Sequence, residues 1–275
     1  MSLAPIFRLF HKPRPSPIPP GWQDPRFNDR KGFIRHLAGD GIELGPLQYP
    51  LDVSENRRIT RLRYVDRYTK DELLQLFPEL ESARSAIVET DVLCDVIHGL
   101  TPFKDDSLDF VIAGHLIEHM PDPIFFVNEC WRVLRPGGVL FLIVPDKNTG
   151  YDIKRTITSL PHVIDDHRRR IREVEDHHLD EFVRLTENLE VPADPAARQA
   201  LFNRYKDRSI HIHVWDPPAF AEFFSYCART SAPFSLIEAT SPRGTHRNEI
   251  TIIVRKVREP VPEFERQLRA SLDPP

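Results

Sequence analysis

Apolar and polar residues follow one another along this chain in the order expected of an α/β protein. Leu108 to Ala113 and Val139 to Val144 are short, nearly continuous apolar runs, which are typical of strands covered on both faces. Between them, Ile124 to Leu134 places apolar side chains at helical spacing, and Arg135-Pro-Gly-Gly138 ends that helix. This segment predicts two parallel strands joined by a helix.

The ends of these two strands are the first places to expect a ligand. A parallel pair leaves both carboxyl ends at one edge of the sheet, and open α/β sheets bind ligands at that edge. Two polar loops follow the strands there, Ala113-Gly-His115 and Pro145-Asp-Lys147. We therefore expect both loops to border a binding site.

Strand and helix patterns also occur on either side of this segment. Before it, we expect an entry helix over Phe27–Leu37, strands over Gly41–Gly45, Arg61–Asp66 and Ala86–Leu93, and a helix over Lys70–Leu76. After it, we expect a charged helical stretch over Tyr151–Asp207 and strands over Ile210–Trp215, Phe234–Ala239 and Glu249–Val254. Alternating strands and helices followed by a terminal hairpin predict a mixed sheet whose last strand is antiparallel. The spacing of apolar residues by itself predicts five of these strands.

We expect one domain over residues 27–257, with a helical insert at about 151–208. Residues 1–26 form an extended arm in this interpretation, because five prolines fall between Pro13 and Pro20. Residues 258–275 form a tail with a helix around Glu263 to Leu272.

Composition narrows the environment and the partners. The 275 residues include 41 acidic and 37 basic side chains, for a net charge of −4, so no global charge favours nucleic acid or an anionic membrane. Cys94, Cys130 and Cys227 lie far apart in apolar segments, which indicates buried thiols in a cytoplasmic protein. The sequence shows neither a secretory signal nor a membrane span. A protein partner or a homodimer is compatible with these features.

Three motifs in the central segment resemble those of class I S-adenosylmethionine-dependent methyltransferases. They are Asp106-Ser-Leu-Asp-Phe-Val111, Ile117-Glu-His119 and Arg132-Val-Leu-Arg-Pro-Gly-Gly138. The resemblance implies a Rossmann-like sheet of seven strands, mostly parallel with the last strand antiparallel, and helices on both faces. It also implies S-adenosyl-L-methionine as the cofactor.

The first strand departs from the common form of that family. Its glycine-rich turn is reduced to Glu43-Leu-Gly-Pro-Leu-Gln-Tyr-Pro50, in which only Gly45 remains. This turn, with Pro145-Asp-Lys147 and the motif from Tyr151 to Asp165, resembles a subfamily often associated with glycan or secondary-metabolite biosynthesis. The resemblance covers about residues 40 to 256.

Asp66 is the residue on which the cofactor prediction depends most. It ends the second predicted strand, where a carboxylate can accept hydrogen bonds from both ribose hydroxyls. After the third strand, the resemblance assigns the adenine contact to Asp95 with Val96 and leaves Asp91 as a turn residue. The full set of expected cofactor residues is Glu43, Gly45, Pro46, Asp66, Arg67, Asp95, Val96, Ala113, Gly114 and His115.

Candidate catalytic and acceptor-binding residues follow the fourth and fifth strands and continue into the insert. Methyl transfer is an in-line displacement, so positioning should contribute more than acid-base chemistry. His115 is the first candidate general base, followed by Asp146 and His119, although Glu118 and His119 also fit a role in shaping their loop. The residues expected to contact the acceptor are Lys147, Tyr151, Arg155, His211 and His213.

Half of the twelve histidines lie between residues 151 and 213. On one helix from Ile164 to Phe182, His167 and His178 would share the inward face but stand roughly 16 Å apart, too far for a shared metal. His211 and His213 would share a strand face, as substrate contacts, proton acceptor or structural residues. Two imidazoles lack the further ligand that a divalent site needs, so we expect no metal.

The leading hypothesis is O-methylation of a glycan, a nucleotide sugar or a related small metabolite. Arg155 and Lys147 suit an acidic or phosphorylated acceptor, although they also fit a salt-bridged helix face. The alternative hypothesis is a catalytically silent methyltransferase-like module that binds a partner, which the two missing glycines favour. A nucleic-acid methyltransferase is disfavoured, because Ala113-Gly-His-Leu116 replaces the Pro-Pro loop expected after the fourth strand.

Overall fold

The computed structural model describes residues 29–206, 209–242 and 249–273. The proline-rich arm expected over residues 1–26 lies outside this range.

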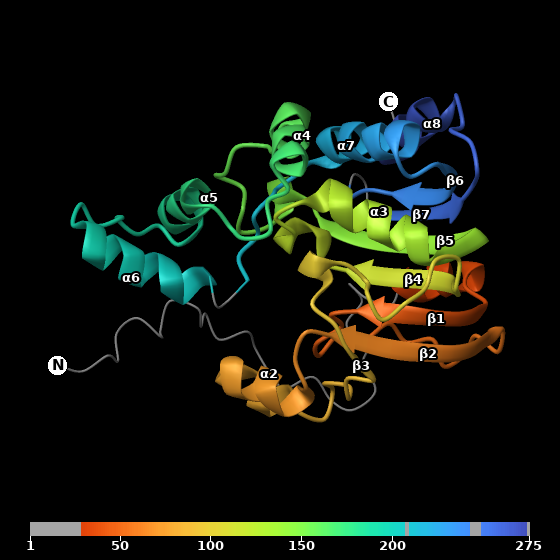
Figure 1. The fold of residues 1–275 in the computed structure, drawn as a ribbon, viewed down its shortest axis with the longest axis horizontal. Helices are drawn as coiled ribbons and strands as arrows, with labels where there is room; N and C mark the ends of the chain where they lie inside the picture. Colours follow the sequence, from red (N-terminus) through yellow and green to blue (C-terminus); the bar gives the residue numbers. More distant parts are fainter. Residues whose placement is uncertain (1–28, 207–208, 243–248, 274–275) are drawn as a thin grey trace.

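The described residues form a Rossmann-like sheet of seven strands in the order β3-β2-β1-β4-β5-β7-β6 (Figure 1). The strands are β1 (Gly39–Leu44), β2 (Ile59–Asp66), β3 (Val92–Leu93), β4 (Leu108–Gly114), β5 (Leu134–Pro145), β6 (Phe234–Thr240) and β7 (Glu249–Lys256). Only the β5/β7 and β6/β7 pairs are antiparallel, so β7 is the reversed strand. The predicted fold class is confirmed.

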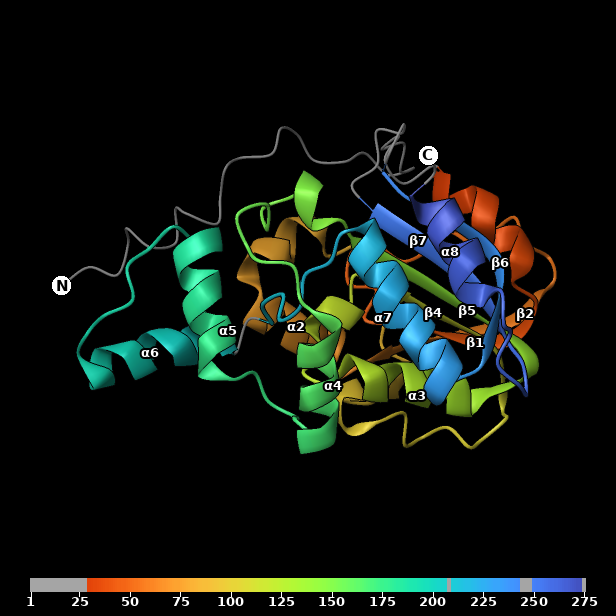
Figure 2. The same ribbon diagram turned by 90° about the horizontal axis from the view of Figure 1, so that it is seen from above.

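Helices surround this sheet and extend beyond one end of it (Figure 2). The α-helices are α2 (Lys70–Leu76), α3 (Pro123–Val133), α4 (Leu160–Arg169), α5 (Asp176–Glu181), α6 (Pro195–Lys206), α7 (Pro217–Thr230) and α8 (Phe264–Leu272). Shorter helical turns are η2 (Asp29–His36), η3 (Pro78–Ala83), η4 (Val96–His98), η5 (Ile117–His119), η6 (Lys147–Thr149) and the π-helical η7 (Phe182–Thr186). None of the helices among the described residues is long and apolar enough to span a membrane.

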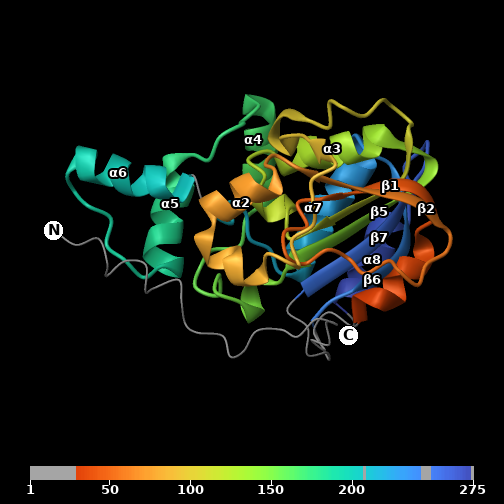
Figure 3. The same cartoon turned by 90° about the horizontal axis from the view of Figure 1, so that it is seen from below.

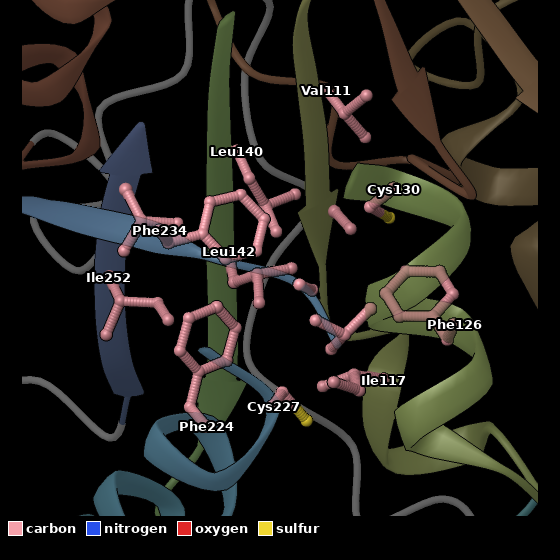
Figure 4. Close-up of a cluster of buried hydrophobic side chains, with 14 of the residues drawn as sticks. Val111, Ile117, Phe126, Cys130, Leu140, Leu142, Phe224, Cys227, Phe234 and Ile252 are labelled. Carbon is pink, nitrogen blue, oxygen red and sulfur yellow. The ribbon is translucent and has the colours of Figure 1, made fainter. Parts of the chain in front are cut away.

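The main core lies between the sheet and the layer formed by α3, α7 and α8. Leu140 and Leu142 of β5 face Phe126 of α3 and Phe224 of α7 in this layer (Figure 4). Alternate residues of the same strands, such as Phe141, contact η2 on the opposite face. Burial on both faces explains why β4 and β5 read as continuous apolar runs.

The insert has a small core of its own and lies beyond the carboxyl end of the sheet (Figures 1 and 3). Phe182 and Phe202 pack in this core with Ile210 and Ile212, which follow α6 in the chain. The backbone carbonyl of Glu118 in η5 accepts hydrogen bonds from the N–H groups of Ile212 and His213. The segment 209–215 therefore connects the insert to the loop that follows β4.

Three expected elements are wrong. Only Val92 and Leu93 of the third predicted strand are paired with β2, because residues 86–91 form a turn, bends and irregular chain. Residues 210–215 are not a strand and contribute one isolated bridge, from Trp215 to Asp146. The expected helix from 164 to 182 ends at Arg170, whose left-handed backbone has φ of 57°, and α5 is a separate helix.

Candidate functional site

Two adjoining cavities lie at the carboxyl edge of the sheet, where β1, β2, β4 and β5 end. Their volumes are about 150 Å³ and 410 Å³. Gly45, Leu47, His115 and His119 line both, so the cavities form one bent cleft. Small-molecule sites commonly occupy roughly 300 to 1,000 Å³, so the cleft has the size of a small-molecule site.

Asp66 ends β2 and lines the smaller cavity, as the sequence predicted. Its Oδ1 accepts a hydrogen bond from the backbone N–H of Tyr68 at 3.0 Å, which orients the carboxylate. Burial raises the pKa of Asp66, and the N–H groups of Tyr68 and Arg67 oppose this shift. Arg67 lines the same cavity and lies over the Tyr68 ring, with 4.5 Å from its guanidinium carbon to the ring centre.

Asp95 and Val96 line the smaller cavity as well. The Asp95 carboxylate accepts a hydrogen bond from the N–H of Ile97 at 3.1 Å and so begins η4. Asp91 instead accepts a hydrogen bond from the N–H of Tyr64 at 2.8 Å and does not line the cleft. The structure thus places Asp95, rather than Asp91, at the cavity.

Most of the other predicted cofactor residues border the larger cavity. Glu43, Gly45, Pro46 and Gly114 line it, and Gly45 has a left-handed backbone with φ of 58° that suits glycine. Ala113 does not line either cavity: it is 1% exposed and packs in the main core. Its predicted place in the site is wrong, because successive side chains of a strand face opposite sides of the sheet.

His115 lies where the two cavities join, held between two carboxylates. Its Nε2 is 2.7 Å from Glu249 Oε1, and its Nδ1 is 3.5 Å from Glu118 Oε1. Burial lowers the pKa of His115, but the bonds to Glu118 and Glu249 outweigh burial and raise it to about 9. The imidazole is therefore protonated at neutral pH, which argues against its predicted role as a general base.

Glu118 is fully buried among three imidazoles. Its Oε1 lies 4.0 Å from His119 Nε2 and 3.9 Å from His211 Nε2, in addition to its contact with His115. Burial acts to raise the pKa of Glu118, but the His115 bond and the neighbouring imidazoles lower it overall. Burial and His211 lower the pKa of His119 to about 4, so His119 is neutral and a weak base.

His211 is the centre of a chain of three polar groups at the edge of the larger cavity. Its Nδ1 is 2.6 Å from Asp152 Oδ2, and its Nε2 is 2.6 Å from the Tyr151 hydroxyl. Because a carboxylate only accepts, Nδ1 donates its hydrogen to Asp152, and in the neutral tautomer Nε2 offers a lone pair. Tyr151 and His211 both line the cavity, and Nε2 is directed at the Tyr151 hydroxyl.

Three predicted acceptor contacts do not line the cleft. Arg155 is 2% exposed and donates hydrogen bonds to Asp152, Glu181 and the backbone of the 209–215 segment. Lys147 is 8% exposed, and its Nζ is 3.3 Å from the carbonyl of Ile153. His213 is fully buried. All three were placed in the cleft wrongly, because the insert folds back over them.

Some residues of the cleft carried no assignment from the sequence. Arg30 of η2 lines the larger cavity, forms an ion pair with Glu249 and lies 3.4 Å from His115 Nε2. From the sequence, Glu249 was expected only as the first residue of a strand. Arg30 lies before the first strand among other basic residues, and no pattern distinguished it. Asp146 does line the cavity as expected, and its Oδ1 accepts a hydrogen bond from the N–H of Asn148 at 2.9 Å.

Comparisons with known proteins converge on methyltransferases in the central segment. Residues 72–142 match the family model of a methyltransferase domain. A probable S-adenosylmethionine-dependent methyltransferase of Mycolicibacterium smegmatis is 45% identical over 58 residues, which cover 20% of this chain and 23% of that protein. A ubiquinone biosynthesis O-methyltransferase of Xanthomonas campestris is 35% identical over 74 residues, 25% of this chain and 31% of that protein. The chain thus spans less than a third of the length of these relatives.

Likeness in structure extends over more of the chain. A Rhodobacter sphaeroides protein described as a Zn-dependent alcohol dehydrogenase superposes with a TM-score of 0.51 at 15% identity, over 85% of this chain and 92% of that one. Identity this low establishes a shared fold only. Similarity to methyltransferases is thus carried by the sequence of the central segment, and the structure adds only a shared fold.

Proposed function

We propose that this protein is a class I S-adenosylmethionine-dependent methyltransferase that methylates a hydroxyl group of a small acceptor. The observation that carries the proposal is the position of Asp66. Its carboxylate ends β2 and faces a cavity that continues into a second, more polar cavity beside His211. A nucleoside cofactor and an acceptor would then lie end to end along the carboxyl edge.

The residues of the cleft fit S-adenosylmethionine. Asp66 would hold the ribose hydroxyls, and Asp95 with Val96 would border the adenine. Glu43 lines the larger cavity, and its Oε2 has no hydrogen-bond partner among the described residues, so a cationic group of the ligand would satisfy it. When bound, this cofactor supplies an electrophilic methyl group on a positively charged sulfur.

His211 is the general base in this proposal. An acceptor hydroxyl would replace the Tyr151 hydroxyl at Nε2, pass its proton to that nitrogen and form the new oxygen–carbon bond as the sulfur–carbon bond breaks. Asp152 holds the required tautomer and stabilises the imidazolium, as a carboxylate does behind a catalytic histidine. The buried Glu118 charge, 3.9 Å from Nε2, adds to that stabilisation.

The larger cavity favours a polyhydroxylated acceptor, such as a glycan, a nucleotide sugar or a related metabolite. Arg30, His115, Asp146, Tyr151 and Glu249 line it with hydrogen-bonding groups of both kinds. Arg30 and the protonated His115 replace Arg155 and Lys147 as the cations that an acidic acceptor would meet.

Calorimetric titration of the full chain with the demethylated cofactor, S-adenosylhomocysteine, tests the first half of the proposal. We expect one binding site per chain, with the affinity lost in Asp66→Ala. Absence of heat at millimolar ligand would instead favour a catalytically silent module.

Substitution of His211 tests the chemistry. His211→Gln should lower kcat about 10²- to 10⁴-fold, the usual contribution of a general base, with little change in cofactor affinity. Tyr151→Phe is the matched control and should retain most of kcat, because Tyr151 is displaced. Equal losses in both variants would remove His211 from the chemical step.

A further inference from the structure

A second group of imidazoles lies outside the cleft, where the insert meets the rest of the domain. His162 and Asp166 belong to α4, His178 belongs to α5, and His213 belongs to the segment 209–215. Three separate stretches of chain therefore direct nitrogen and oxygen atoms to one point. Asp166, His178 and His213 are buried, at 1%, 7% and 0% exposure.

The ligand atoms of this cluster have the spacing of a metal site. His162 Nε2 is 3.2 Å from Asp166 Oδ2 and 3.3 Å from His178 Nε2, and His213 Nε2 is 3.8 Å from Asp166 Oδ2. All four ligand atoms lie within 4.8 Å of one another. Four ligands around a tetrahedral zinc ion, bonded at about 2.0 to 2.2 Å, stand roughly 3.3 Å apart.

Hydrogen bonding within the cluster does not satisfy these atoms. Asp166 Oδ2 and His213 Nε2 have no hydrogen-bond partner among the described residues. His162 Nε2 carries either one hydrogen or one lone pair, so it cannot donate to Asp166 and accept from His178 together. Buried polar atoms without partners are costly, and a bound cation would remove that cost for the whole group.

The surroundings prepare the cluster for a cation in two ways. Arg169 donates a hydrogen bond of 2.8 Å to Asp166 Oδ1, which leaves Oδ2 directed at the imidazoles. Such outer contacts orient ligands in known metal sites. Asp166, His178 and His213 are also buried, so these ligand atoms are held away from solvent.

We propose that His162, Asp166, His178 and His213 bind one divalent zinc ion that fastens the helical insert to the methyltransferase domain. Three imidazoles and one carboxylate form a complete tetrahedral set, which is the arrangement of a structural rather than a catalytic zinc site. The ion would join α4, α5 and the segment 209–215. That segment also carries His211, so the ion would help to hold the proposed base in place.

The second histidine group fits zinc less well. Glu118, His119 and His211 supply only three ligands. The distances from Glu118 Oε1 are 4.0 Å to His119 Nε2 and 3.9 Å to His211 Nε2, and His211 Nε2 already lies 2.6 Å from the Tyr151 hydroxyl. A tetrahedral ion would require larger movements there.

Metal content of the full chain tests the proposal without any activity assay. After treatment with a chelator, incubation with zinc sulfate and removal of excess metal, mass spectrometry of the metal should find one zinc per chain. Zinc should also raise the melting temperature, because a ligand that binds only the folded state stabilises it. His178→Gln and His213→Gln should weaken zinc binding by more than about 100-fold, beyond the roughly 10- to 100-fold typical of changes outside the ligand set.

His177→Gln is the matched control. His177 lies next to His178 on α5, is exposed and packs against the His178 ring at 4.0 Å between ring centres, yet it is outside the set of four. The His177→Gln protein should bind zinc as the unchanged protein does. Unchanged binding in His178→Gln and His213→Gln, or loss in His119→Gln instead, would overturn the assignment.

X-ray absorption at the zinc edge of the unchanged protein keeps the test valid if the variants do not fold. The expected spectrum has only nitrogen and oxygen neighbours, with the outer-shell scattering of three imidazoles. A sulfur neighbour, fewer imidazoles or no retained zinc would contradict the proposal. None of these measurements depends on methyl transfer, so the zinc site and the proposed function can fail separately.

Discussion

The carboxyl edge of the sheet and the helical insert place their functional groups in different ways. At the edge, Asp66 ends β2, Asp95 lies two residues after β3 and His115 directly follows β4, so hydrogen bonding between neighbouring strands sets their separation. At the insert, His162 and His178 come from two helices, and His213 comes from the segment 209–215 that follows. The positions of the functional groups at the sheet edge follow from local sequence pattern. Those at the insert depend on how separate segments of the chain pack together.

The protonation of histidine also differs between these two regions, because it depends on the groups that pack around each ring. His115 is held between Glu118 and Glu249, and its pKa rises to about 9. His178 and His213 lie away from solvent beside other imidazoles, and their pKa values fall. The same residue type is therefore a cation in one region and a neutral lone-pair donor in the other.

The largest expected effect distinguishes the main core from the core of the insert. Phe224→Ala in the main core should cost about 3 to 5 kcal/mol of unfolding free energy for the whole domain, measured by urea unfolding. Phe202→Ala in the insert core should loosen the insert while binding of S-adenosylhomocysteine persists. If Phe202→Ala instead abolished cofactor binding, the insert and the sheet would form one cooperative unit.

A smaller effect is expected at the cofactor side of the edge. Asp66→Ala should raise the dissociation constant of S-adenosylhomocysteine at least tenfold, because hydrogen bonds to a charged acceptor contribute roughly 1.5 to 3 kcal/mol each. Circular dichroism should show an intact fold. Asp91→Ala is the control, since Asp91 bonds to the backbone of β2 and does not line the cleft. Equal weakening in both variants would indicate a general effect on β2.

The smallest expected effect concerns the charge of His115. Its pKa is raised on folding, so its contribution to stability is complete below its ordinary pKa of 6.5 and is lost as pH rises through about 9. The difference in melting temperature between the wild type and His115→Gln should therefore shrink from pH 6 to pH 10. A difference that grew over this range would show that His115 is neutral in the folded protein.

Several parts of the fold could be read from local sequence because neighbouring residues decide them. Thr69 begins the helix Lys70–Leu76 by exchanging hydrogen bonds with Glu72, and the helix appears with the predicted bounds. The apolar runs of β4 and β5 could be recognised because both faces are buried. Arg170 shows the limit: its charged neighbours read as a continuing helix, but the chain turns there in a left-handed conformation.

The sequence alone determined most of the strands and helices, the acid at the end of β2 and the loops that border the cleft, because each depends on residues adjacent in the chain. Tertiary structure decided which side chains enter that cleft. Arg155 is buried and hydrogen-bonded to other residues, so it does not reach the cleft. Arg30 lines the cleft although it lies before the first strand. His211 bonds to Asp152, which is 59 positions away in the chain. The protonation of the histidines and the clustering of three imidazoles around Asp166 result from burial and long-range contacts. No local sequence pattern encodes either of them.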